Sequence, residues 1–151
     1  MINEPKKEYN REMHTAEHVL NRTMIRLFGT QRSVSNHIEK KKSKCDYKFH
    51  RALTADELEM LENEVNFVIA QSLEVKESFV TREEAASLYD TSKLPEDAVG
   101  TIRIIKVGDY DFCPCIGEHV GNTSEIGAIS VISSDYNPEN GILRIRFKLS
   151  G

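Results

Sequence analysis

The stretch Ile142-Leu-Arg-Ile-Arg-Phe-Lys-Leu149 places apolar side chains at every second position from Leu143 onward. This alternation is typical of a β-strand that buries one face. Residues 128–132 form a second extended segment, and the turn-forming stretch Asn137-Pro-Glu-Asn-Gly141 stands between the two. An antiparallel hairpin with one apolar face is therefore predicted near the end of the sequence.

Two amphipathic helices are predicted in the first half of the sequence. Between residues 13 and 28 the apolar side chains recur at helical spacing, and Gly29 follows as a stop signal. Thr54 and Glu57 form a capping box ahead of a second helix. The buried stripe of this second helix comprises Leu58, Leu61, Val65, Val68 and Ile69.

The remaining segments have mostly strand character. Strands are expected at residues 33–38, 45–51, 72–80, 101–107 and 110–113. Thr81 and Glu84 are expected to cap a short helix that runs to about Tyr89. Helices cluster early and antiparallel strands dominate late, which predicts an α+β fold with helices packed on one face of a largely antiparallel sheet. No repeat or Pro/Gly-rich linker interrupts residues 1–151, so a single domain is expected.

Composition excludes several classes of protein. The chain has 151 residues, 39% of them hydrophobic and 29% charged, with a formal net charge of -4. These values favour a globular domain over a disordered chain, and no apolar run is long enough to span a bilayer. The first residues lack the apolar stretch of a secretory signal, and three cysteines argue against a disulfide framework. A cytoplasmic protein without a membrane partner is expected.

The charge is unevenly distributed along the sequence. The first fifty residues carry eleven basic and six acidic side chains, including the run Lys40, Lys41 and Lys42. The negative net charge argues against a general nucleic-acid binder, and no DNA partner is expected. The lysine run has two interpretations: a solvated loop between two strands, or a contact with the phosphates of an RNA partner.

Two pairs of side chains have the spacing of metal ligands. His14 and His18 stand four residues apart on the first predicted helix, so both imidazoles lie on one face. Cys115 and His119 repeat this spacing about a hundred residues later. Nitrogen and sulfur donors in this combination suit tetrahedral zinc, and the coincidence of two pairs favours one shared ion. Cys113 remains a competing ligand.

The sequence leaves the role of the zinc open. Four protein ligands are typical of a structural site, whereas three ligands plus water are typical of a catalytic one. The His-Glu-x-x-His arrangement of metalloproteases is missing, because the glutamate of His14-Thr-Ala-Glu-His18 directly precedes the second histidine. A protease of that class is therefore disfavoured.

The two motifs also carry a resemblance to a known family. His14-Thr-Ala-Glu-His18, Cys115-Ile-Gly-Glu-His119 and Glu125-Ile-Gly127 resemble, in this order, the editing domain shared by alanyl- and threonyl-tRNA synthetases. With the compact length and the terminal hairpin, the chain is most similar to the small class of AlaX-type free-standing alanyl-tRNA editing proteins. The resemblance extends over nearly the whole chain.

This resemblance implies hydrolysis of the ester in a mischarged tRNA, typically a seryl group on an alanine tRNA. It places the zinc ligands at His14, His18 and Cys115, with His119 as a fourth ligand or a supporting residue. It aligns a hydroxyl residue that is important for deacylation with Ser35. An ordinary strand serine is the alternative interpretation of Ser35. Two rival functions remain: a non-catalytic zinc-bearing RNA-binding module, and a zinc hydrolase that acts on a different small ester.

Overall fold

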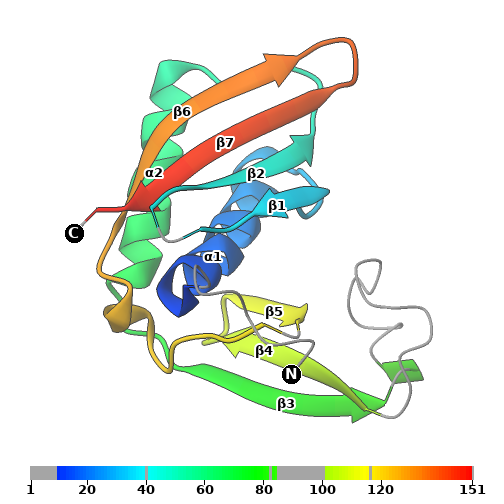
Figure 1. The fold of residues 1–151 in the computed structure, drawn as a ribbon, viewed down its shortest axis with the longest axis vertical. Helices are drawn as coiled ribbons and strands as arrows, with labels where there is room; N and C mark the ends of the chain where they lie inside the picture. Colours follow the sequence, from blue (N-terminus) through cyan, green and yellow to red (C-terminus); the bar gives the residue numbers. More distant parts are fainter. Residues whose placement is uncertain (1–9, 40, 82, 85–100, 116, 151) are drawn as a thin grey trace.

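The computed structural model describes residues 10–39, 41–81, 83–84, 101–115 and 117–150 (Figure 1). In chain order, its elements are α1 (Arg11–Phe28), β1 (Ser35–His37), β2 (Ser43–Lys48), α2 (Ala55–Ile69), β3 (Val75–Thr81), β4 (Thr101–Val107), β5 (Asp111–Pro114), the short 3-10 helix η1 (Thr123–Glu125), β6 (Ile129–Asn137) and β7 (Ile142–Leu149). Neither α-helix in these residues is long and apolar enough to cross a membrane.

The strands form two antiparallel sheets, so the predicted α+β class is confirmed with a division that the sequence analysis did not foresee. One sheet has the order β1-β2-β7-β6, and the other has the order β3-β4-β5. Both α-helices lie behind the four-stranded sheet in Figure 1 and pack against each other. The three-stranded sheet lies beside α1, and Asp111 of β5 contacts His18 and Arg22 in the middle of that helix.

The main core fills the space between the four-stranded sheet and the helices. Leu143, Ile145 and Phe147 of β7 are fully buried, which confirms the predicted apolar face of this strand. Leu20 of α1 and Leu61 of α2 belong to the same buried cluster. Each such side chain contributes about 1.5–3 kcal/mol when removed from water, so this layer is the main source of stability.

Caps fix the ends of the helices that were expected from sequence. The Asn10 side chain accepts a hydrogen bond from the Met13 backbone N–H at 2.7 Å and begins α1. Gly29 ends this helix in the left-handed conformation with φ 69°, as its stop signal predicted. The reciprocal bonds of the Thr54–Glu57 capping box are also present. The start of α1 is therefore held in place, which matters because His14 lies in its first turns.

Several boundaries differ from the sequence-based expectations. β6 extends well beyond residue 132, because a register shift between Val131 and Ser133 breaks the alternation that the prediction relied on. β3 begins at Val75 rather than at residue 72, since Ser72 adopts a positive φ of 55°. Thr81 and Glu84 make the expected reciprocal hydrogen bonds. Glu83 and Glu84 are helical, and the rest of the helix that was predicted to run to about Tyr89 lies outside the described residues.

Candidate metal centre

Four side chains from two distant parts of the sequence form one compact group. The N-terminal half of α1 supplies His14 and His18, and the segment after β5 supplies Cys115 and His119. Their potential ligand atoms all lie within 4.8 Å of one another. This group could bind a metal ion, as the two sequence motifs predicted.

The spacing of these donor atoms suits a tetrahedral ion. The Cys115 Sγ lies 3.4 Å from His119 Nε2 and 3.7 Å from His14 Nε2. A tetrahedral zinc site with ordinary Zn–S and Zn–N bonds separates sulfur and nitrogen donors by about 3.5 Å. These two sulfur–nitrogen separations therefore match those of a tetrahedral zinc site.

Each histidine of the group is held through its Nδ1 atom. Nδ1 of His14 lies 3.3 Å from the Glu118 carbonyl oxygen, and Nδ1 of His18 lies 3.3 Å from a carboxylate oxygen of Asp111. A carbonyl and an ionised carboxylate only accept hydrogen bonds, so both Nδ1 atoms carry the proton. Nε2 is then the nitrogen of each ring that could bind an ion, an arrangement common among zinc-binding histidines.

Thr15 determines the tautomer of the third histidine. Its hydroxyl donates its single hydrogen to the Arg11 carbonyl oxygen at 2.8 Å. The same oxygen accepts the backbone N–H of Val120 at 3.1 Å and lies 3.2 Å from His119 Nδ1. With its hydrogen already used, the hydroxyl accepts from Nδ1–H of His119. His119 therefore also directs a basic Nε2 towards Cys115.

The carboxylate of Asp111 is fully buried and connects the site to two arginines. Arg22 Nε donates to it at 3.0 Å, and Arg32 makes a second ion pair with the same oxygen. Burial alone would raise the pKa of Asp111, but the hydrogen bond from His18 and the charges of Arg32, His18 and Arg22 lower it to about 2. Asp111 thus stays ionised and keeps His18 in place.

The two neighbouring cysteines differ in position and in thiol pKa. Burial raises the pKa of Cys115, but its hydrogen bonds with His119, His14 and His18 outweigh burial and lower the pKa to about 3. Burial raises the pKa of Cys113 to about 11, and its thiol donates to the Pro114 carbonyl oxygen. The thiolate is the metal-binding form, so Cys115 is the better ligand on both position and charge.

The structure does not bring Ser35 into this group. Ser35 lies in the exposed edge strand β1, opposite Asp46 of β2. The next residue, Asn36, donates through its side chain to Glu17 of α1 at 2.9 Å. Because successive side chains of a strand point to opposite faces, Ser35 points away from α1. A direct role of Ser35 in the chemistry stays a prediction from sequence.

Two of the three predicted RNA-binding lysines fall within the described residues. Lys41 and Lys42 are exposed in the connection between β1 and β2, and Lys40 lies outside the described residues.

The sequence analysis missed Thr15 and Asp111, which orient the ligands. The sequence offered no signal for these contacts beyond the presence of Asp111 in the strand expected at residues 110–113.

Comparison with known proteins adds a family-level similarity. Residues 102–146 match the family described as "Threonyl and Alanyl tRNA synthetase second additional domain". This match contains both Cys115 and His119. It supports a relationship to the editing region of these synthetases.

Longer similarities cover most of the chain. This chain is 32% identical over 145 residues to an alanine–tRNA ligase of Saccharolobus islandicus, and the alignment covers 89% of this chain and 15% of the ligase. A Fervidobacterium nodosum alanine–tRNA ligase is 30% identical over 133 residues, covering 87% of this chain and 15% of the ligase. The corresponding enzyme of Streptococcus pneumoniae is 33% identical over 125 residues, covering 81% and 14%. The chain thus spans about one seventh of the length of these relatives.

Proposed function

We propose that this protein hydrolyses the ester bond of a mischarged aminoacyl-tRNA, acting on the tRNA as a separate protein. The observation that carries the proposal is the group of three histidines and one cysteine, built from two motifs in a chain similar to part of alanine–tRNA ligases. The editing region of the related synthetases makes deacylation the favoured chemistry.

The donor set favours zinc as the metal. His14, His18 and Cys115 would hold the ion, with His119 as a fourth ligand or as a residue that supports Cys115. Zinc bound there would supply a Lewis acid, able to polarise an ester carbonyl or to activate a water. The chain's own contribution is orientation, because Asp111 and Thr15 fix the imidazole rings to which they bond.

The proposed substrate is a seryl group on an alanine tRNA. An apolar pocket that accepts alanine rejects an added hydroxyl by only about a hundredfold, so errors with serine need a second, hydrolytic check. A site that hydrogen-bonds the hydroxyl discriminates better, because alanine would leave a buried polar group unpaired. This proposal does not depend on Ser35, whose side chain lies on the face of β1 that points away from α1.

A second candidate function is a non-catalytic zinc-bearing module that binds tRNA or another RNA. The closeness of all four donor atoms favours this alternative, since a closed set of four protein ligands is typical of structural zinc. Both the deacylase and the binding module would bind zinc, but only the deacylase would hydrolyse aminoacyl-tRNA.

The test is deacylation of seryl-, glycyl- and alanyl-tRNA of the alanine type and of seryl-tRNA of the threonine type. Each reaction is run with and without a chelator, beside Cys115→Ala and the matched control Cys113→Ala. We expect chelator-sensitive release of serine by the wild type and the control, and no release by Cys115→Ala. Zinc bound at one ion per chain without release from any substrate would refute the deacylase and favour the binding module.

A further inference from the structure

The exposed face of the four-stranded sheet carries an excess of positive charge. Because the apolar residues of β2 and β7 point towards the helices, the alternate residues point outward. On β2, β7 and β6 this outer face comprises five cations, Lys44, Lys48, Arg144, Arg146 and Lys148, and two carboxylates, Asp46 and Asp135. The excess is local, because the chain as a whole has a net charge of -4.

The carboxylates of this face are already engaged. Arg144 binds Asp46 through two hydrogen bonds of 2.7 and 2.9 Å, and Arg146 lies 2.6 Å from Asp135. Among the described residues, no carboxylate forms an ion pair with the outward-facing lysines of β2 and β7. The ammonium groups of these lysines therefore remain available to an anionic partner.

One row of side chains across the sheet lines a cavity. His37, Lys44 and Arg146 are register partners on β1, β2 and β7, so they lie side by side on the same face. With Lys42, Ser43 and Glu39 they enclose about 260 Å³. Glu39 is paired with His37. The cavity thus contains three cationic side chains, one of which belongs to the predicted lysine run.

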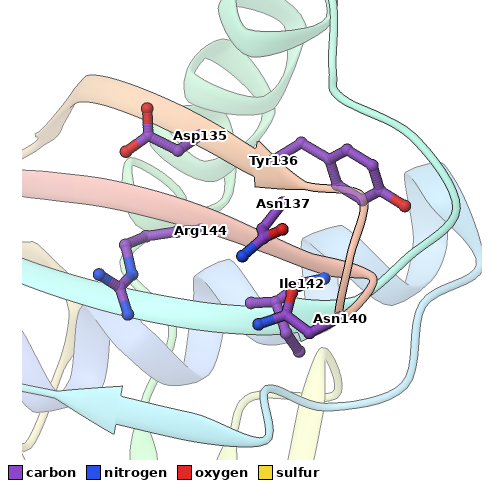
Figure 2. A pocket seen from close by; sticks show the side chains of 6 residues that line it. All are labelled: Asp135, Tyr136, Asn137, Asn140, Ile142 and Arg144. Atoms are coloured by element: carbon purple, nitrogen blue, oxygen red, sulfur yellow. Dashed lines mark hydrogen bonds between the residues drawn. The ribbon is translucent and has the colours of Figure 1, made fainter.

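A second cavity lies further along the same sheet, towards the β6–β7 turn (Figure 2). It measures about 200 Å³ and is lined by Arg144, by the amide side chains of Asn137 and Asn140, and by Asp135, Tyr136 and Ile142. Arg144 and Arg146 are two residues apart on β7, so they connect the two cavities. Guanidinium and amide groups are common donors to the phosphates and sugars of nucleic acids.

We propose that this outer face, from the cavity at Lys44 to the cavity at Arg144, binds the phosphate backbone of the tRNA. The proposal rests on the proposed function and adds the surface that holds the body of the substrate. Outward residues two apart on a strand are separated by about 6.7 Å, which is close to the spacing of successive phosphates in a nucleotide chain.

The edge strand β1 connects this face to the metal centre. Asn36 of β1 is hydrogen-bonded to Glu17, which directly precedes the ligand His18 on α1. The next residue of β1, His37, lines the first cavity. An RNA on the outer face can therefore reach the metal group by passing the edge of a single strand.

The experiment measures binding of uncharged alanine tRNA to the zinc-loaded full chain as a function of salt. The test variant is Lys44→Gln/Lys148→Gln, which removes two lysines without breaking an ion pair among the described residues. The control is Lys76→Gln, which removes an exposed lysine from β3 in the other sheet. Equal midpoints of thermal unfolding show that the variants are folded.

For the double variant we expect weaker binding and a shallower slope in a plot of log K against log salt concentration. The slope should decrease in magnitude by about 1.4–1.8, because each lost phosphate contact removes about 0.7–0.9. The control should keep the wild-type slope. The proposal is overturned if the double variant keeps the wild-type affinity and salt slope. It is also overturned if the double variant loses binding to phosphatidylserine vesicles while its tRNA binding is unchanged. Deacylation is scored separately, so a sensitive binding surface without turnover refutes only the deacylase.

Discussion

Thr15→Val removes one hydroxyl from a fully buried side chain while preserving its shape. In the native protein this hydroxyl accepts hydrogen bonds from His119 and from the Val120 backbone, and it donates to the Arg11 carbonyl. The substitution therefore releases one histidine of the metal group without changing any of its four side chains. It tests the argument that Thr15 fixes the tautomer of His119.

Two separate magnitudes follow from these contacts. Loss of the partner that orients a metal-binding histidine lowers metal affinity by about 10–100-fold, or about 1.4–2.8 kcal/mol. The buried N–H of Val120 also loses its acceptor, which costs the metal-free protein about 1–3 kcal/mol of folding free energy. Thr15→Ser keeps the hydroxyl and should preserve most of both quantities.

Zinc affinity is measured by competition with a chromophoric chelator, and the stability of the metal-free protein by urea unfolding with excess chelator. These two measurements separate the effect on the metal group from the effect on the fold. If Thr15→Val lowers stability but keeps zinc affinity within about twofold of the wild type, the hydroxyl does not orient His119.

Three other predictions follow from the structure. Asp111→Asn should reduce zinc affinity by about 10–100-fold in the same competition assay, because the amide holds His18 less well; unchanged affinity would contradict this. Thr54→Ala should cost about 1 kcal/mol in urea unfolding by removing the cap of α2, and a loss below a few tenths would show that the cap is dispensable. The hydrogen bonds from Arg144 lower the pKa of Asp46, so this carboxylate stabilises the fold above its ordinary pKa and loses that effect as the pH falls through its folded pKa. Acid titration of stability should therefore be flatter for Asp46→Asn, and an unchanged acid limb would count against the pair.

The sequence predicted elements whose signals are local. The Thr54–Glu57 cap, the stop at Gly29 and the alternation of β7 depend only on nearby residues, and all three are present in the structure. The division of the strands into two sheets depends on long-range pairing and left no such signal. The end of β6 was missed because the register shift after Val131 interrupts the two-residue period.

The metal group shows the same division between local and long-range information. Spacing along the chain predicted the pairs His14–His18 and Cys115–His119, since each pair lies within one short segment. The residues that orient the ligands come from the tertiary fold: Asp111 reaches His18 across 93 positions of sequence. Periodicity says nothing about such contacts, so their identification required the structure.

The metal group joins α1 to the segment after β5. About a hundred residues of chain separate the pair His14–His18 from the pair Cys115–His119. A bound ion would therefore act as a reversible cross-link between the ends of a long loop. For a disulfide, closing a loop of this length is worth about 4–5 kcal/mol in the chain-entropy treatment. A metal cross-link differs in being tunable: above the dissociation constant, each tenfold rise in free metal adds about 1.4 kcal/mol to the stability of the whole fold. The supply of metal would then control how long the folded protein survives.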